Sequence, residues 1–307
     1  MGLFRLAARH GPLCLVLGLL AGLLLPSVAQ TLKPWLGEMI AVLLFLTALR
    51  IGARAAWGGL GDQRRSLGLI AVLQLVAPLA AIAVFSLAGV MASPFFLAVV
   101  LMLAAPSLSG SPNLAIMMGV EPSAILRLLV LGTALFPLTA IPVLWLLPAT
   151  GGSGEALLAA LRLIAVIVAS VGAGFLLRRI GLPDLSDDQR AALDGMSTIV
   201  LAIVVVGLMS AIGPLARSDP MRLLGWLVAV MGTNLGLQFA TLLLARRFGV
   251  PEASALSIVS GNRNIALFLI ALPAQVMDPL LIFIGCYQVP MYLTPLLMRR
   301  FHRAARP

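Results

Sequence analysis

The sequence predicts an all-α membrane protein with ten transmembrane helices, arranged as two inverted five-helix repeats. Three observations lead to this prediction: few charged residues, ten apolar segments of spanning length, and a polar motif that occurs once in each half of the chain. The repeats are expected to cover residues 1–148 and 149–307, with the fourth and ninth helices broken and crossing.

The composition excludes a soluble globular protein. The chain has 307 residues, of which 61% are hydrophobic and 10% are charged, and its mean hydropathy is +1.09. A soluble domain carries about 25% charged residues, so the solvent for most of this surface must be lipid. The net charge of +10 does not indicate nucleic-acid binding, because the arginines lie at the ends of apolar segments.

Apolar segments long enough to span a bilayer, roughly 20 residues each, follow one another along the chain. No connection between them is long enough to form a soluble domain. The first segment also resembles a secretory signal, with Arg5 and Arg9 before it and Ser27-Val28-Ala29 at its end. We keep it as a span, because its removal would leave nine spans and break the symmetry described below. The expected spans are residues 12–29, 36–52, 66–88, 94–118, 124–147, 155–177, 191–213, 222–245, 253–272 and 279–298.

Basic residues set the expected orientation. Sixteen of the 21 basic residues fall on the same side of the membrane as the N-terminus, and one, Arg263, lies within a span. Because Lys and Arg are concentrated in cytoplasmic loops, both termini are expected in the cytoplasm and the chain in a bacterial inner membrane. The four basic residues on the other side are Lys33, Arg162, Arg217 and Arg222.

A polar motif occurs in the fourth span and again in the ninth. Ser109-Gly110-Ser111-Pro112-Asn113-Leu114-Ala115 matches Ser260-Gly261-Asn262-Arg263-Asn264-Ile265-Ala266 in Ser, Gly, Asn and Ala, at an offset of 151 residues. Five spans per repeat is an odd number, so the second repeat enters the membrane from the opposite side and the repeats are inverted. In the following span of each half, Gly132, Pro137 and Pro142 match Gly285, Pro290 and Pro295 at an offset of 153 residues.

The motif is expected to interrupt both helices midway across the membrane. Pro112 removes a backbone donor, and Gly110 and the Ser260-Gly261 pair weaken a helix. Unwound backbone at membrane depth is tolerated only where it is buried or lines a watery cavity. Half-helix N-termini then direct positive dipoles inward, and freed carbonyls become ligands. The alternative is a pair of ordinary kinks with small residues for helix packing.

Ten spans with polar breaks in the fourth and ninth resemble the bile acid:sodium symporter family, over essentially the whole chain. Further local matches are Gln74 followed by Pro78 in the third span, and the pattern Ser260-Gly261-x-x-Asn264 in the ninth. The resemblance implies a panel domain of spans 1, 2, 6 and 7 that moves against a core domain of spans 3–5 and 8–10. It also implies a substrate at the crossover, of the class of bile acids, keto acids or pantothenate-like carboxylates.

The sequence departs from the family at its sodium sites. Sodium-coupled members carry a Glu and a Gln in span nine where this chain has Val259 and Arg263, and hydroxyl residues in span five where it has Leu126 and Val130. An arginine 4 Å from a sodium ion would repel it by about 4 kcal/mol at an effective dielectric constant of 20. We therefore expect the two-sodium coupling to be lost. The residual sodium-site positions are Gln74, Asn113 and Asn264.

Arg263 is the only basic residue expected deep in the membrane. A charge at this depth costs about 2.5–3.5 kcal/mol on insertion scales, and such charges usually act in function. One hypothesis is that Arg263 permanently replaces the missing sodium and holds the crossover together through carbonyls. A second is that its planar fork binds the carboxylate or sulfate of the substrate. No acid is expected deep in a span to pair with it, since Glu38 and Asp194 are placed near span ends.

The other candidate site residues are polar side chains in or beside the two motifs. Neither a cofactor nor a metal ligand set is expected. The expected substrate-binding residues are Ser109, Ser111, Asn113, Asn262, Arg263, Asn264 and Gln288, and the weaker cavity-lining candidates are Gln74, Thr133, Asn234 and Tyr287.

The expected function is secondary transport of a small organic anion by alternating access, independent of sodium. Exchange, proton coupling and downhill transport stay open, and proton coupling has the least support, because no Asp, Glu or His is expected near the crossover. The alternative of the same class is a sodium-coupled symporter, and that of another class is a channel or sensor. An enzyme is not expected, because no cluster of His, Asp, Glu or Cys falls within the spans.

Overall fold

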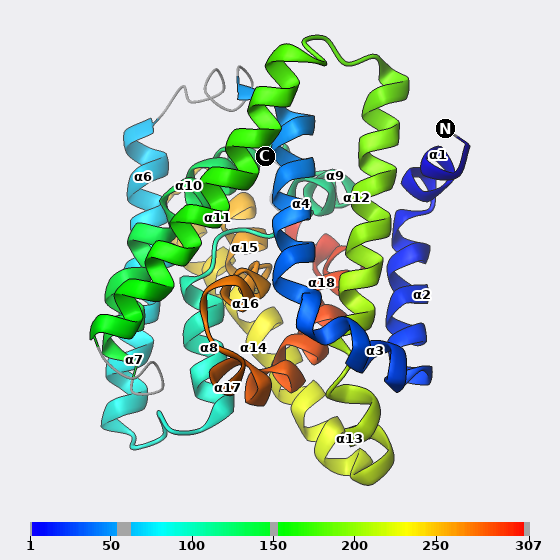
Figure 1. Cartoon of the computed structure of the whole chain (residues 1–307). Helices are drawn as coiled ribbons and strands as arrows, with labels where there is room; N and C mark the ends of the chain where they lie inside the picture. Colours follow the sequence, from blue (N-terminus) through cyan, green and yellow to red (C-terminus); the bar gives the residue numbers. More distant parts are fainter. Residues whose placement is uncertain (1, 54–62, 148–152, 304–307) are drawn as a thin grey trace.

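The computed structural model describes residues 2–53, 63–147 and 153–303 (Figure 1). Within these ranges the chain is all-α, with one isolated β-bridge and no strand. The N- and C-terminal ends of the chain both lie toward the upper end of the molecule as drawn. The expected boundary between the halves, at 148/149, lies outside the described residues.

The described helices follow one another with short connections. In the first half they are α1 (Gly2–Arg9), α2 (Gly11–Leu24), α3 (Pro26–Leu32), the 3₁₀ turn η1 (Lys33–Trp35), α4 (Leu36–Ile51), α6 (Gln63–Ala71), the π-helical turn η2 (Val72–Val76), α7 (Ala77–Leu87), α8 (Pro94–Ala104), α9 (Ser111–Met118) and α10 (Ser123–Leu146). In the second half they are α11 (Ser153–Ile180), α12 (Asp187–Leu208), α13 (Ile212–Ser218), α14 (Pro220–Arg247), α15 (Ala253–Gly261), η4 (Ile265–Leu267), α16 (Phe268–Ala271), α17 (Ala274–Met277), η5 (Asp278–Leu280) and α18 (Leu281–Arg303).

Seven helical segments of the described ranges are long and apolar enough to cross a membrane, so the protein is a multi-pass membrane protein. Two shorter apolar helices, Leu13–Leu24 and Pro94–Ala104, accompany them. The seven long segments are Pro26–Ile51, Gln63–Leu87, Ser123–Leu146, Gly154–Ile180, Asp187–Ser218, Pro220–Arg247 and Ala274–His302.

The predicted end of the first span, residue 29, is wrong, while α4 (Leu36–Ile51) matches the second predicted span, 36–52, to within one residue. α2 ends at Leu24, and Pro26 begins α3, because proline fits the first turn of a helix, where no donor is needed. The η1 turn joins α3 to α4 directly, so that residues 26 to 51 form one apolar segment of 26 residues. Glu38 lies in the first turn of α4, near the start of that helix, as predicted.

Local sequence determines where two of the long helices begin. At the start of α12, the Ser186 hydroxyl accepts from Gln189 N at 3.2 Å, and the Gln189 side chain accepts from Ser186 N at 2.9 Å, which is a capping box. At the start of α14, Asp219 accepts a hydrogen bond from Arg222 N at 2.9 Å, and Pro220 occupies the first turn. These caps satisfy backbone donors that a membrane interface would otherwise leave unpaired.

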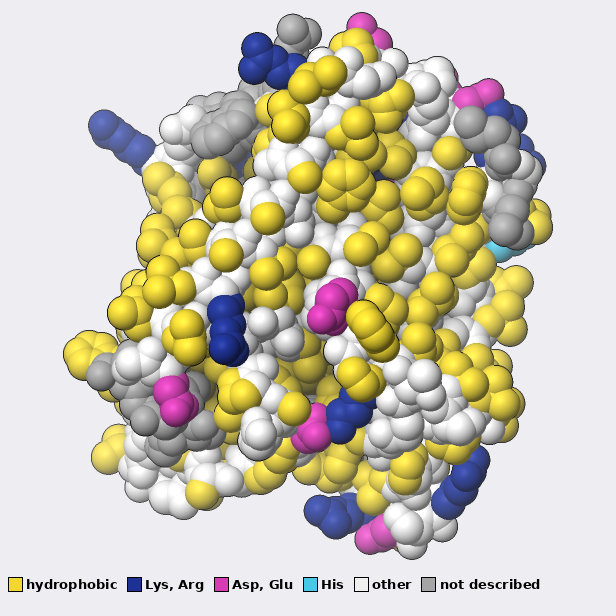
Figure 2. All heavy atoms as spheres, viewed as in Figure 1, with side chains coloured by type: hydrophobic (Ala, Val, Ile, Leu, Met, Phe, Trp, Pro, Cys, Tyr) yellow, Lys and Arg dark blue, Asp and Glu magenta, His cyan; other side chains and the backbone are white. Residues whose placement is uncertain are grey.

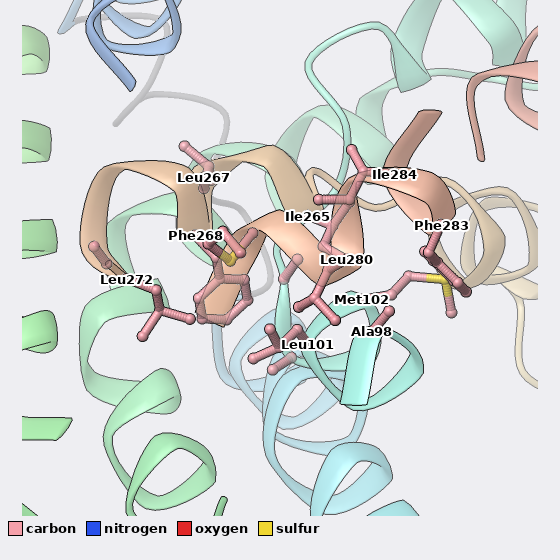
Figure 3. Close-up of a cluster of buried hydrophobic side chains, with 14 of the residues drawn as sticks. Ala98, Leu101, Met102, Ile265, Leu267, Phe268, Leu272, Leu280, Phe283 and Ile284 are labelled. Carbon is pink, nitrogen blue, oxygen red and sulfur yellow. The ribbon is translucent and has the colours of Figure 1, made fainter. Parts of the chain in front are cut away.

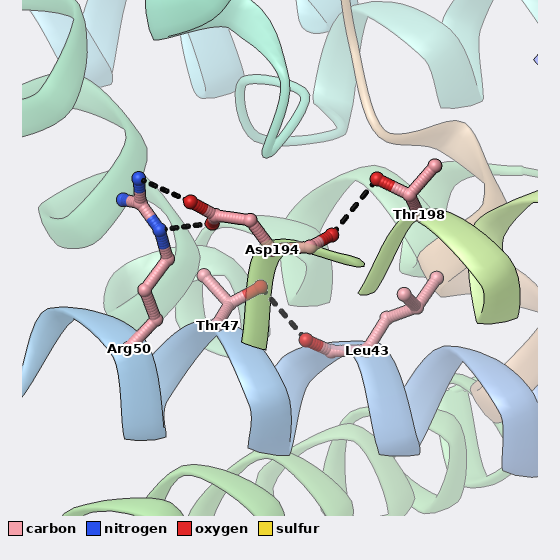
Figure 4. Close-up of polar contacts among 5 residues, drawn as sticks. All are labelled: Leu43, Thr47, Arg50, Asp194 and Thr198. Carbon is pink, nitrogen blue, oxygen red and sulfur yellow. Dashed lines mark hydrogen bonds and ion pairs between the residues drawn. The ribbon is translucent and has the colours of Figure 1, made fainter. Parts of the chain in front are cut away.

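Ion pairs at the upper end of the molecule connect segments that are far apart in the sequence. Arg50 pairs with Asp194, whose backbone carbonyl accepts from the Thr198 hydroxyl at 2.8 Å (Figure 4). Arg5 of α1 likewise forms an ion pair with Asp188 of α12. At the other end, Lys33 and Asp278 are 2.7 Å apart. Because these side chains are exposed, each pair stabilises the fold by at most about 1 kcal/mol, and they mainly indicate which helix ends share a side of the membrane.

The helices pack in two groups. α12 packs against α1, α2, α3 and α4, and α11 packs against α4, while α14 packs against α15 and α18, and α10 against α6, η2 and α9. Between the groups lies a continuous apolar cluster, drawn in Figure 3, that includes Leu101, Leu267 and Phe268, none of them exposed. The Phe268 ring meets Phe136 edge-on, with 5.0 Å between ring centroids. The cluster therefore surrounds the helix breaks described next.

The outer surface is suited to lipid. On the face drawn in Figure 2, hydrophobic side chains cover most of the area, and charged side chains gather mainly at the two ends, with a few between them. Large apolar side chains such as Leu87 and Val168 are 90% and 65% exposed. In a soluble protein such a surface would cause aggregation, but in a bilayer it is the surface that meets the acyl chains.

Candidate functional site

Two helix breaks form the centre of the candidate site. α8 ends at Ala104, where the backbone becomes extended and leads into Pro106, which cannot continue a helix for lack of an N–H. The second break follows α15, because Asn262 leaves the helical conformation at φ −115° and ψ 83°. A helix resumes only with η4 and α16. Both breaks free backbone groups that need partners.

The two breaks provide those partners for each other. Leu108 N donates to Asn262 O at 2.9 Å, and Asn264 N donates to Pro106 O at 2.9 Å. Between these bonds, Ser107 and Arg263 form an antiparallel bridge. Unwound backbone that is buried in this way is permitted at membrane depth, because its donors and acceptors stay paired.

The buried side chain of Arg263 links the two paired breaks, which together are called the crossing. Its side chain is 1% exposed, and its guanidinium donates to Ala105 O at 3.0 Å, Leu73 O at 3.2 Å and Ser260 O at 3.3 Å. Leu73 belongs to the π-helical turn η2, a conformation that interrupts the regular hydrogen bonding of a helix. The planar fork of arginine thus connects α6–α7, α8 and α15 through carbonyl dipoles. No carboxylate of the described residues pairs with it.

Neutral donors satisfy the carbonyl of Gly261. The Tyr287 hydroxyl accepts from Arg263 N at 3.0 Å and donates to Gly261 O, and the Asn234 amide donates to the same oxygen. Tyr287 is fully buried, and its ring stacks on Phe283 at 5.8 Å. Tyr287 and Asn234, predicted as cavity-lining residues, therefore hold the second break in place.

A buried polar network behind the second break was missed by the sequence analysis. Gln238 donates to Asn234 Oδ1 at 2.7 Å and to Thr294 Oγ1 at 2.9 Å, and Thr294 donates to Asn262 Oδ1 at 3.3 Å. Ser257 donates to Gln238 O at 2.7 Å. Asn234 and Gln238 are four residues apart on one helix, so they share a face. That spacing is the signal that could have identified Gln238.

In the first half, Gln74 lies in the π-helical turn η2. It is 2% exposed, and its Oε1 accepts from the Thr139 hydroxyl at 3.2 Å. Gly132 makes room for it, since any Cβ there would collide with the Gln74 amide. Gln74 therefore packs against α10 and is not open to solvent.

The predicted substrate-binding residues fall into two sets. Ser109 and Asn113 are exposed, Asn264 is half-buried, and none of the three side chains has a hydrogen-bond partner among the described residues. Thr133, a weaker candidate, is also half-buried. The other four residues, Ser111, Asn262, Arg263 and Gln288, are buried, and their side chains bond within the protein.

No model of a known protein family and no curated protein matches this sequence.

The geometry assigns different chemistry to the two sets. The buried side chains hold the two breaks together through hydrogen bonds. The side chains of Ser109, Asn113 and Asn264 offer uncharged donors and acceptors next to the breaks. Arg263 adds a buried positive charge that no described carboxylate pairs with. A fixed positive charge in a region of low dielectric attracts anions. The crossing is therefore suited to a ligand that is negatively charged and accepts hydrogen bonds.

Proposed function

We propose that this protein is a secondary transporter that moves a small organic anion across the membrane by alternating access, without sodium. One observation carries the proposal: two helix breaks, after Ala104 and after Gly261, are hydrogen-bonded to each other around an arginine that no carboxylate of the described residues pairs with. Broken helices that meet at mid-membrane are the construction that secondary transporters use to bind substrates.

In this proposal the described helices make up ten spans in two inverted repeats, a divergent form of the bile acid:sodium symporter architecture. The broken spans are α8–α9 and α15–α16. The group that contains α4, α11 and α12 acts as the panel, and the group of α6–α10, α14, α15 and α18 acts as the core. The division is supported by the packing of α12 on α2 and α4 and of α14 on α15 and α18, and the two groups meet where α10 and α16 contact α11. The end that carries both termini faces the cytoplasm of a bacterial inner membrane, in keeping with its excess of arginine.

Independence from sodium follows from the position of Arg263. Its guanidinium already occupies the carbonyls of Ala105, Leu73 and Ser260, which a metal ion would otherwise need. Two positive charges 4 Å apart repel each other by about 4 kcal/mol at an effective dielectric constant of 20. The arginine supplies a permanent positive charge at the place where a sodium-coupled transporter would bind and release a sodium ion.

The melting temperature of the purified protein tests the proposal. Taurocholate, pyruvate and pantothenate are added separately, in sodium chloride and in potassium chloride. A ligand at one hundred times its Kd stabilises the native state by about 2.7 kcal/mol. We expect stabilisation by at least one of these anions, equal in the two salts, and counterflow of that anion in proteoliposomes. Stabilisation that requires sodium would contradict the sodium-independent mechanism, and an absence of counterflow would contradict transport.

Replacing Asn113 or Asn264 with leucine is expected to weaken binding of the stabilising anion about tenfold, the effect of losing one hydrogen bond to a charged acceptor. The melting temperature of the free protein should stay unchanged, because neither side chain has a partner in the described structure. Thr233→Val serves as the control, since that hydroxyl bonds only to Ala229 O of its own helix. Equal affinities of all three variants would exclude the two asparagines from the binding site.

A further inference from the structure

The Lys33–Asp278 ion pair connects the panel to the core. Lys33 belongs to η1, which packs against α3 and α4 of the panel, whereas Asp278 belongs to η5, which packs against α8 and α18 of the core. Three other ion pairs of the described residues each lie within a single group, and they are Arg5–Asp188, Arg50–Asp194 and Arg65–Glu252. The Lys33–Asp278 pair therefore differs from these three in what it holds together.

Local sequence places both charged side chains on short, stiff turns. Lys33 precedes Pro34 in η1, Asp278 precedes Pro279 in η5, and each proline lies in the first turn of its 3₁₀ helix. Because proline has a nearly fixed φ, both turns have little conformational freedom. Lys33 Nζ donates to Asp278 Oδ2 at 2.7 Å. Two stiff turns thus present opposite charges to each other across the boundary between panel and core.

Two close approaches between panel and core accompany the ion pair. In the first turn of α4, a Cβ on Gly37 would lie 3.3 Å from Leu269 O of α16. Near the start of α18, which directly follows η5, a Cβ on Gly285 would lie 3.1 Å from Leu208 O of α12. In this half of the molecule, opposite the two termini, the panel and the core are therefore packed together backbone against backbone.

The half that carries the termini is arranged differently. Its ion pair Arg50–Asp194 connects α4 to α12, which both belong to the panel. α9, which carries the exposed Asn113, lies in this upper half (Figure 1). The contacts that join the two groups through charge thus lie on one side of the membrane, and the exposed polar side chain of the candidate site lies toward the other.

We propose that the Lys33–Asp278 ion pair is a latch that keeps the carrier closed on the side opposite the termini and opens when the binding site turns to that side. This inference rests on the proposed function and adds a gate to it. In alternating access, two rigid groups separate on one side of the membrane while they close on the other. Since Lys33 and Asp278 belong to different groups, the two side chains must part when their side opens.

The exposure of the pair suits a latch that opens in every transport cycle. The two side chains are 28% and 45% exposed, so water solvates both charges once they separate. An exposed ion pair of this kind changes an equilibrium constant by up to about fivefold. A fully buried pair would be far more costly to break, because each charge would be left without a partner in a region of low dielectric. The Lys33–Asp278 pair therefore biases the carrier toward one state without trapping it there.

Distances between spin labels on the two groups test the latch without any transported anion. The labels are attached at Thr31 of α3 and Gln275 of α17, two exposed positions, and both native cysteines are replaced by alanine. Lys33→Ala should raise the population with longer distances up to about fivefold, and Arg50→Ala, the control within the panel, should leave it unchanged. The exchanged pair, Lys33→Asp with Asp278→Lys, should restore the wild-type distances. Identical distances in the wild type, Lys33→Ala and Asp278→Asn would overturn the proposal.

A reversible cross-link between the two turns tests the role of the latch in transport. Lys33→Cys with Asp278→Cys, joined by a reducible bis-methanethiosulfonate reagent, should lose counterflow of taurocholate, pyruvate or pantothenate, because the two groups can no longer separate. Reduction of the cross-link should restore counterflow. The same reagent on Arg50→Cys with Asp194→Cys ties α4 to α12 within the panel and should leave counterflow unchanged.

The two measurements distinguish failure of the latch from failure of transport. Full counterflow by the cross-linked Lys33→Cys, Asp278→Cys variant would overturn the latch and leave the proposed function intact. Absence of counterflow in the wild type would contradict the proposed function, and the label distances would still decide whether the ion pair holds the two groups together.

Discussion

Replacing Arg263 with methionine is expected to destabilise the protein by about 3 kcal/mol or more. The variant leaves the carbonyls of Ala105, Leu73 and Ser260 without their charged donor in a site that is 1% exposed. Each unsatisfied buried acceptor costs about 1–3 kcal/mol. Denaturant unfolding in detergent micelles measures the loss directly, and the response to the stabilising anion should disappear in the same variant.

Arg263→Lys tests the positive charge of the side chain separately from the planar geometry of the guanidinium. Lysine keeps the positive charge, but its ammonium is a point donor that cannot span three carbonyls as a planar fork does. We expect a stability between those of the wild type and Arg263→Met, with the anion response partly retained. A methionine variant that folds and binds anions as the wild type does would show that the crossing needs neither the charge nor its hydrogen bonds.

Gly261→Ala is expected to cost about 1–3 kcal/mol, the usual effect of overpacking a buried position. The added Cβ would lie 2.7 Å from the carbonyl oxygen of Asn234, a backbone atom that cannot move without shifting α14. The same methyl would press against Gln238 and disturb the network that holds the second break.

Gly110, the matching glycine of the first motif, is the control for this prediction. Its nearest neighbour to an added Cβ is the Leu108 side chain at 3.8 Å, and its φ of −80° suits any residue. Gly110→Ala should therefore stay within about 0.5 kcal/mol of the wild type. Unfolding measurements that give the two variants equal stability would mean that the two breaks are packed alike.

This difference reflects a wider asymmetry between the two halves. The second break supplies Arg263, whose guanidinium satisfies carbonyls of the first half, while the carbonyl of Gly261 is satisfied by Asn234 and Tyr287. The first motif has Pro112 at the position of Arg263 and so cannot return the interaction. The asymmetric network explains why more polar residues are buried around the second break.

Much of the fold could be predicted from the sequence, because its signals are local. Apolar length indicates membrane spans, and the repeated Ser-Gly…Asn motif indicated where helices are interrupted. α15 does end within the second motif, but α8 ends at Ala104, before the first motif, and Pro112 lies in the first turn of α9. Prolines were harder to interpret, since Pro26 falls inside the first predicted span, 12–29, and in fact starts α3. A proline fits either position, and neighbouring residues do not decide between them.

The site was less predictable, because it depends on contacts between distant segments. The sequence by itself determined a multi-pass, all-α membrane protein and the polar character of both breaks, since composition and backbone chemistry suffice for that. Only the tertiary structure decided that Arg263 meets Leu73 O, that Gln238 and Thr294 join the network, and that Ser109 and Asn113 have no side-chain partner among the described residues. The physical reason is that burial and pairing of a polar side chain depend on which helix crosses it, and that crossing is set by packing across the whole chain.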